Sequence, residues 1–218
     1  MEKRLVIVGT AHVSPRSIEE VKEIIEKERP DAVAVELCPR RFKTLVEGYR
    51  ENISHLDVLK KGDVFLLLFQ IILSHLQKKI GEEYGVRPGQ EMLTAIEKAR
   101  EIGADVILID RDIAVTFKRF WTSLGFFEKI KFIWYLIRTS SNDVEIDEML
   151  KQDILDSLIR EFRKISPKAA NVLIDERDLY MAANLLNVMK KYNKVVAVVG
   201  AGHKKGIETA LELSLIHI

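Results

Sequence analysis

Two short motifs at opposite ends of the chain carry side chains that could do chemistry. The first is Gly9-Thr10-Ala11-His12, and the second is Gly200-Ala201-Gly202-His203. Each motif ends a short run of β-branched residues, so each histidine is expected just beyond the end of a strand. Glu36 stands near the end of a third such run. Two imidazoles and a carboxylate form a ligand set that binds zinc or another divalent metal ion with one coordination position left open.

Each of these residues also has a purely structural interpretation. A histidine after a strand is often a hydrogen-bonding group of the fold. Glu36 lies in the run Ala-Val-Ala-Val-Glu-Leu, where a buried carboxylate without a partner would be costly. Its partner could be Arg40, Arg41 or a metal ion, and a structural ion pair remains an alternative to a metal site.

Three further groups of charged residues are candidates for the same site. They are Glu91, the triplet Asp110-Arg111-Asp112, and the run Asp175-Glu176-Arg177-Asp178. A second carboxylate could act as a general base on metal-bound water, while an arginine could stabilise the developing oxyanion. The alternative is that these acids cap helices or interact favourably with the helix dipole, without any chemistry.

The elements that must position these residues are read from the hydrophobic spacing. Strands are predicted over residues 4–8, 32–37, 105–109 and 194–199, with helices over 15–29, 39–49, 63–80 and 90–102. Residues 114–191 are almost wholly helical in pattern, with breaks near Gly125, Pro167 and Asp175 and at residues 140–142. The predicted fold is therefore α/β, a small, mostly parallel sheet flanked by helices, with a large helical insertion before the last strand.

Such a sheet would bring the candidate residues to one edge. Ligands of open parallel sheets bind outside the carboxyl ends of the strands, and all four predicted strands end there in polar residues. Gly9 and Gly200 are expected to let the chain leave the sheet sharply, and Gly202 to let backbone approach a ligand. A short helix is expected from about Lys204.

Composition excludes some classes of function and bounds others. The 218 residues contain 34 Lys plus Arg against 33 Asp plus Glu, which gives no charge excess that would recruit nucleic acid. The single cysteine, Cys38, cannot form an internal disulfide and favours a reducing compartment. The apolar stretch 64–76 is shorter than the roughly 20 residues that span a bilayer.

The end of the chain is expected to have a different origin from the rest. Residues 213–218, Leu-Ser-Leu-Ile-His-Ile, match a translation of a common sequencing adapter, so we expect them to be foreign. Residues 1–212 are then a single domain, and the native C-terminal part is expected to be missing. His217 has no assigned role.

Several segments together resemble the TraB/PrgY family. They are Gly9-Thr10-Ala11-His12-Val13-Ser14, Val35-Glu36-Leu37-Cys38 with Arg41, Gly89-Gln90-Glu91-Met92, Asp110-Arg111-Asp112, Glu176-Arg177-Asp178, and Val199-Gly200-Ala201-Gly202-His203 with Gly206-Ile207. Their order along the chain is the family's order. The resemblance covers nearly everything before the adapter-like tail.

The resemblance implies both a function and a set of residues. TraB/PrgY proteins are linked to the shutdown of peptide pheromones, and their TIKI relatives are regarded as metal-dependent proteases. Carried onto this chain, the family site implies His12, Glu36 and His203 as ligands of Mn, Co or Zn. A further group of catalytic candidates comprises Arg41, Glu91, Asp110, Arg111 and Glu176.

The expected function is thus a metal-dependent, peptidase-like hydrolase. The alternative is a regulatory protein that binds a peptide at the same site without cleaving it. Expected partners are a peptide or a small amide or ester substrate and no nucleic acid, with a homo-oligomer left open. Family members usually continue into C-terminal transmembrane helices, so the resemblance implies a cytoplasmic-side domain whose membrane contact lies in the missing C-terminal part.

Overall fold

The computed structural model describes residues 3–10, 15–47, 89–131, 163–164 and 166–216. Its strands are β1 (Arg4–Thr10), β2 (Ala32–Val35), β3 (Asp105–Leu108) and β4 (Lys194–Gly200). Its helices include α1 (Pro15–Glu28), α2 (Pro39–Glu47), α5 (Gln90–Ile102), α6 (Ile113–Ser123), α9 (Pro167–Ala170), α10 (Glu176–Lys191) and α11 (Ala201–Ile216), with a π-helical stretch η2 (Asn171–Asp175) between α9 and α10.

The four strands form one parallel sheet in the order β1-β4-β2-β3. The first and last strands of the chain are neighbours, and their register pairs Thr10 with Gly200. β2 and β4 are central and consist almost entirely of buried Val and Ala, as expected for parallel strands that are covered on both faces. The predicted α/β fold with a small parallel sheet is confirmed.

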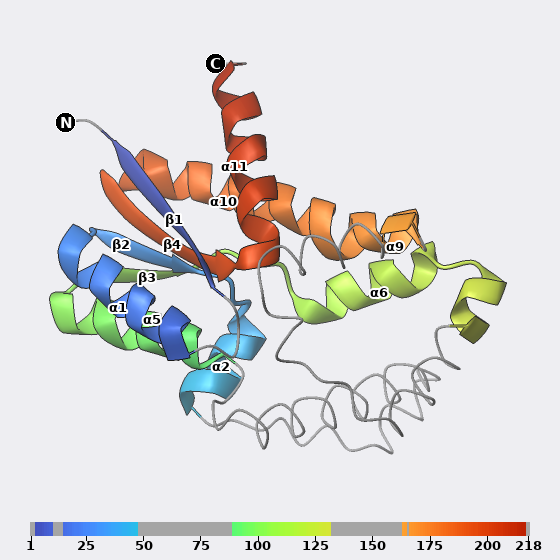
Figure 1. Ribbon diagram of the computed structural model, residues 1–218, viewed down its shortest axis with the longest axis horizontal. Coiled ribbons are helices and arrows are strands. Elements are labelled where there is room, and N and C mark those ends of the chain that lie inside the picture. Colours follow the sequence, from blue (N-terminus) through green and yellow to red (C-terminus); the bar gives the residue numbers. More distant parts are fainter. Residues whose placement is uncertain (1–2, 11–14, 48–88, 132–162, 165, 217–218) are drawn as a thin grey trace.

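Helices cover both faces of this sheet (Figure 1). α1 and α5 pack on one face through a core that includes Val21, Ile25, Met92 and Ile96. α10 and α11 pack on the other face through residues that include Met181, Leu185 and Ile207. The apolar spacing of each helix therefore faces the sheet, and both cores are closed by the strands between them.

A helical block precedes the last strand, as the sequence predicts. α6 packs on α9 and η2 through Phe117, Phe120 and Val172, beside the sheet rather than on it. The predicted break near Asp175 is wrong, because η2 continues directly into α10 with Asp175 in helical geometry. Asp175 therefore does not cap a new helix, whereas Asp112 does cap α6 by accepting a hydrogen bond from the backbone N–H of Ala114 at 2.7 Å.

The local role of the glycines also differs from the prediction. Gly9 and Gly200 both lie inside strands and have no positive φ. A Cβ on Gly9 would come within 3.3 Å of the Ala201 Cα and 3.2 Å of the Lys204 Cδ, so Gly9 permits close packing of α11 rather than a sharp turn. α11 begins at Ala201, three residues earlier than expected, which puts His203 in its first turn.

Some expectations fall on residues that the structure does not describe. His12 and the predicted helix over 63–80 lie outside the described residues. Among the residues that are described, no helix is long and apolar enough to cross a membrane.

Candidate functional site

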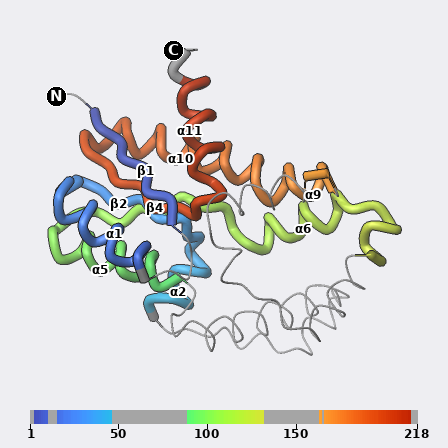
Figure 2. The backbone as a smooth tube through the Cα atoms, viewed as in Figure 1, coloured from blue at the N-terminus to red at the C-terminus, as the bar shows by residue number. Residues whose placement is uncertain are grey.

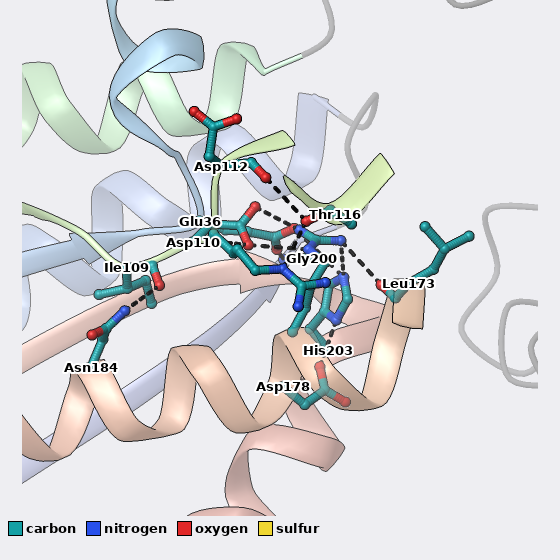
Figure 3. A network of polar contacts seen from close by, with 12 residues as sticks. Glu36, Ile109, Asp110, Asp112, Thr116, Leu173, Asp178, Asn184, Gly200 and His203 are labelled. Carbon is teal, nitrogen blue, oxygen red and sulfur yellow. Dashed lines mark hydrogen bonds and ion pairs between the residues drawn. The ribbon is translucent and has the colours of Figure 1, made fainter. Parts of the chain in front are cut away.

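Polar side chains from three strand ends and one helix meet at the carboxyl edge of the sheet. Glu36 directly follows β2, Asp110 is the second residue after β3, and His203 stands in the first turn of α11 after β4. Figure 3 shows Glu36, Asp110 and His203 facing a common centre. The side chains are 4%, 3% and 12% exposed respectively, so their mutual contacts are made largely out of water.

Arg177 from α10 lies among these three groups and contacts all of them. Its Nη2 is 2.5 Å from Oε1 of Glu36 and 2.8 Å from Oδ2 of Asp110, and its Nε is 3.1 Å from Oδ1 of Asp110. Its Nη1 is 2.9 Å from Nε2 of His203. Burial disfavours the charged guanidinium, but Glu36 and Asp110 outweigh burial and hold the pKa of Arg177 above its ordinary value.

Glu36 is held at both oxygens. Oε1 accepts from Arg177 and lies 3.6 Å from Nε2 of His203, while Oε2 accepts a hydrogen bond from the backbone N–H of Gly200 at 2.6 Å. The glutamate and the histidine are thus anchored to the same turn between β4 and α11. The sequence analysis expected Arg40, Arg41 or a metal ion as the partner of the buried Glu36 carboxylate. In the structure, Arg177 forms an ion pair with this carboxylate.

His203 has a second partner on its other ring nitrogen. Nδ1 lies 2.6 Å from Oδ1 of Asp178, which belongs to the first turn of α10. Burial raises the pKa of the Asp178 carboxyl above its ordinary value, against the opposing effect of the hydrogen bond to His203. Figure 3 shows Asp178 on the side of the imidazole that is turned away from Glu36.

A neighbouring ionic cluster links the site to the helical block. Arg111 donates to Glu176 at 2.8 Å, to Thr116 at 3.0 Å and to the carbonyl of Val172 at 3.1 Å. Arg119 donates to both oxygens of Glu176 at 2.7 Å. Hydrogen bonding to Arg119, and then to Arg111, lowers the pKa of Glu176 to about 2 although burial opposes this shift.

Arg41 and Glu91 belong to the helices α2 and α5, whose first turns lie at this edge of the sheet. Arg41 is partly buried on α2, which begins just after β2 ends. Glu91 is 1% exposed in the first turn of α5. α5 ends two residues before β3 starts, so its first turn points to the carboxyl edge of the sheet. His12 is not described, but Thr10 is paired with Gly200, three residues before His203.

Sequence reasoning named Arg177 and Asp178 only as members of the run 175–178 and gave neither residue a role of its own. Both belong to the Glu176-Arg177-Asp178 segment, from which only Glu176 was selected. The signal that could have found them is their placement in the first turn of an amphipathic helix. Two charged groups there need buried partners, and the histidine and acid at the strand ends are suitable partners.

An open cavity of about 400 Å³ borders the site between η2, α10 and α11. Apolar walls come from Ile174, Leu179 and Leu213, while Lys205 and the Arg163–Asp175 ion pair add charge. Asp178 and Gly202 also line it, so the cavity reaches the residues around His203.

The fold and the site define a class of protein: a parallel α/β domain whose strand ends hold a buried cluster of acids, an arginine and a histidine. The model of the TraB/PrgY/gumN family matches residues 2–214. The chain belongs to this family.

Relatives include proteins from distant organisms. An uncharacterized protein of Methanocaldococcus jannaschii is 43% identical over 204 residues, which cover 92% of this chain and 51% of that protein. The TraB domain-containing protein of Mus musculus is 30% identical over 233 residues, covering 94% of this chain and 62% of its own length, and its Homo sapiens counterpart is 29% identical. The chain spans between half and two thirds of these relatives.

Proposed function

We propose that this chain is a metal-dependent hydrolase that cleaves an amide or ester bond in a peptide-like substrate. The observation that carries the proposal is the approach of His203 Nε2 to Glu36 Oε1 at 3.6 Å, at the buried carboxyl edge of a parallel sheet. These residues lie far apart in the sequence and come from different strand ends. A lone structural histidine would not require such a convergence with two buried acids.

The donor chemistry of the site fits a divalent cation. Three carboxylates, Glu36, Asp110 and Asp178, surround one described guanidinium and one imidazole, so the cluster is rich in negative charge. Among the described residues, no group of three or more His, Cys, Asp or Glu side chains is arranged as a metal site. The proposed ligands are His203 and Glu36, with His12, which lies outside the described residues, as the third.

The metal ion would polarise the scissile carbonyl and lower the pKa of a bound water. The chain's own groups have separate tasks. Arg177 is held at Nε, Nη1 and Nη2 by groups of the chain, so it would favour negative charge on a carbonyl oxygen through its positive charge rather than through a free N–H. Glu91 is the proposed acceptor of the water proton, and Arg41 is a proposed contact for substrate. Arg111 and Glu176 hold α10 and thereby Arg177 in place.

The cavity between η2, α10 and α11 is the proposed binding site of the substrate. Its apolar walls, which include Ile174, Leu179 and Ala210, suit a hydrophobic side chain, and Lys205 offers a positive charge for a carboxylate. Peptides supply both features, whereas the composition offers no general attraction for nucleic acid.

The direct test is metal analysis of the purified protein. We expect about one Mn, Co or Zn ion per chain in the wild type, and a loss of that ion in His203→Ala and Glu36→Gln. His217→Ala is the matched control, because the sequence assigns no role to His217, and it should retain the ion. A wild-type protein that takes up no metal even after incubation with these ions would refute the proposal.

A second candidate is a protein that binds a peptide without cleaving it. The observation that favours it is the contact of Arg177 with both Glu36 and Asp110, which balances part of the buried charge without a metal ion. Incubation with a peptide library plus manganese or cobalt, followed by mass spectrometry, separates the two. New termini that disappear in His203→Ala support the hydrolase, whereas retention of intact peptides supports the binding protein.

A further inference from the structure

One ring nitrogen of His203 faces a hydrogen-bond donor and the other faces a hydrogen-bond acceptor. Nε2 lies 2.9 Å from Nη1 of Arg177, and Nδ1 lies 2.6 Å from Oδ1 of Asp178. A guanidinium has only donors, so Nε2 must accept and carry a lone pair. The proton of the neutral ring is therefore on Nδ1, from which it is donated to the carboxylate. The surroundings of the ring thus select one tautomer of two.

Asp178 is itself held by the shape of the neighbouring helix. A Cβ built on Gly206 would lie 1.9 Å from Oδ2 and 2.7 Å from Cγ of Asp178, so no larger residue fits without moving the carboxylate. Gly206 follows His203 by three residues on α11, and the two therefore share one face of that helix. The carboxylate of Asp178 lies between the imidazole and the bare backbone of Gly206.

We propose that Asp178 and Gly206 form a positioning unit that holds His203 as its Nδ1–H tautomer. Asp178 supplies the acceptor, and Gly206 supplies the space that lets α10 and α11 approach closely enough for the hydrogen bond. The lone pair of Nε2 is thereby available to accept from Arg177, at a point 3.6 Å from Oε1 of Glu36. The catalytic consequence rests on the proposed function, because a metal-binding histidine needs this tautomer and this orientation. The tautomer itself is a property of the chain alone.

A purely structural explanation of Asp178 and Gly206 competes with this proposal. An acid in the first turn of a helix is favourable to the helix dipole, and Asp178 would need no partner for that. Gly206 would then be an ordinary helix glycine, whose replacement by alanine improves helix propensity and stabilises the protein. The two explanations differ in what Gly206→Ala does and in whether the tautomer depends on Asp178.

The test is nitrogen NMR of the metal-free protein carrying ¹⁵N-labelled histidine, at a pH where the ring is neutral. The His203 signals are identified by their loss in His203→Gln. We expect the wild type to show a protonated Nδ1 and an unprotonated Nε2. Asp178→Asn and Gly206→Ala should both shift the signals toward a tautomer mixture. Asp175→Asn, which removes an acid of the Arg163 ion pair near by, should leave them unchanged.

A double-mutant cycle tests the steric part independently of NMR. Gly206→Ala should lower stability in the wild-type background and should not lower it in the Asp178→Ala background, where the carboxylate no longer meets the new methyl group. An equal effect of Gly206→Ala in both backgrounds, a wild-type ring protonated on Nε2, or a tautomer unchanged by both substitutions would overturn the proposal.

A metal titration tests the Asp178–Gly206 positioning unit separately from the proposed metal-dependent hydrolase. If the chain binds a divalent ion, Asp178→Asn and Gly206→Ala should weaken that binding by roughly 10- to 100-fold. If the wild type binds no metal but the tautomer still changes in both variants, the proposed hydrolase fails while the positioning unit stands.

Discussion

Arg177 supplies the positive charge that stabilises the buried acids of the site. Glu36 and Asp110 are almost completely buried, and isolated ionised carboxylates in such surroundings would be very costly. The planar guanidinium reaches both through separate N–H groups while leaving Nη1 for His203. Lysine could not do this, because its single ammonium group lacks the fork geometry. The same contacts keep the candidate ligands preorganised.

Removal of this guanidinium should be severe. We expect Arg177→Met to lower the free energy of unfolding by roughly 3–5 kcal/mol, because it leaves Glu36 and Asp110 buried without their cation. Urea denaturation measures the change. Arg163→Met is the control: its partner Asp175 is 39% exposed, and the pair should contribute under about 1 kcal/mol. Similar losses in the two variants would contradict the role given to Arg177.

Among the elements, α10 carries most of the interactions that assemble the site. It begins directly after the π-helical turn η2, and its first three residues contact α6, the strand ends and α11 in succession. π-helical turns often occur at functional sites, where the extra residue changes the direction of the side chains that follow. Glu176 fastens this end of α10 to α6 through Arg119.

The Glu176 cluster should make stability depend on acidity. The folded pKa of Glu176 is lowered to about 2 from the ordinary 4.5. Its contribution is therefore fully present above about pH 4.5 and is lost as the pH falls toward 2. After allowance for solvent screening, we expect Glu176→Gln to cost about 1–2 kcal/mol at neutral pH.

Urea midpoints of the wild type and of Glu176→Gln, measured from pH 7 to pH 2, check this expectation. The difference between the two proteins should shrink through this acid range. Glu208→Gln, which alters an exposed contact with Lys204 at 4.0 Å, should change stability little at neutral pH. A Glu176→Gln difference that does not vary with pH would contradict the proposed cause.

The packing of α11 on β1 should be sensitive to a single methyl group. Gly9→Ala would place a Cβ 3.3 Å from the backbone of Ala201, which cannot move without shifting the helix start. We expect a loss of about 1–3 kcal/mol in the free energy of unfolding. Gly125→Ala is the comparison, because its Cβ would meet only the flexible end of Glu128. Thermal or urea unfolding distinguishes the two, and equal losses would argue against tight packing at Gly9.

At the scale of the whole molecule, the site exists only in the folded chain. Glu36, Asp110, Arg177 and His203 come from different elements, and they meet because parallel strands end at one edge. A ligand that needs several of them cannot bind the unfolded state with the same affinity. Binding at this site is therefore coupled to the stability of the entire domain.

A bound metal ion should consequently raise the melting temperature. At a concentration of free ion about 100 times its dissociation constant, the stabilisation should be roughly 2.7 kcal/mol. Melting curves with and without Mn²⁺, Co²⁺ or Zn²⁺ measure it. The increase should be absent in His203→Ala and present in His217→Ala. An equal increase in both variants would place the binding elsewhere on the protein.

The sequence by itself determined the parallel α/β fold, because buried parallel strands must be short apolar runs and the helices between them must show one apolar face. It also determined that Glu36, Asp110 and His203 lie at strand ends on a common edge. It could not determine the partners. Arg177 and Asp178 come from a helix whose rotation depends on how α10 packs against the sheet and α11, and no local pattern encodes that packing. The space at Gly206, which only the approach of these two helices reveals, was likewise decided by the tertiary structure.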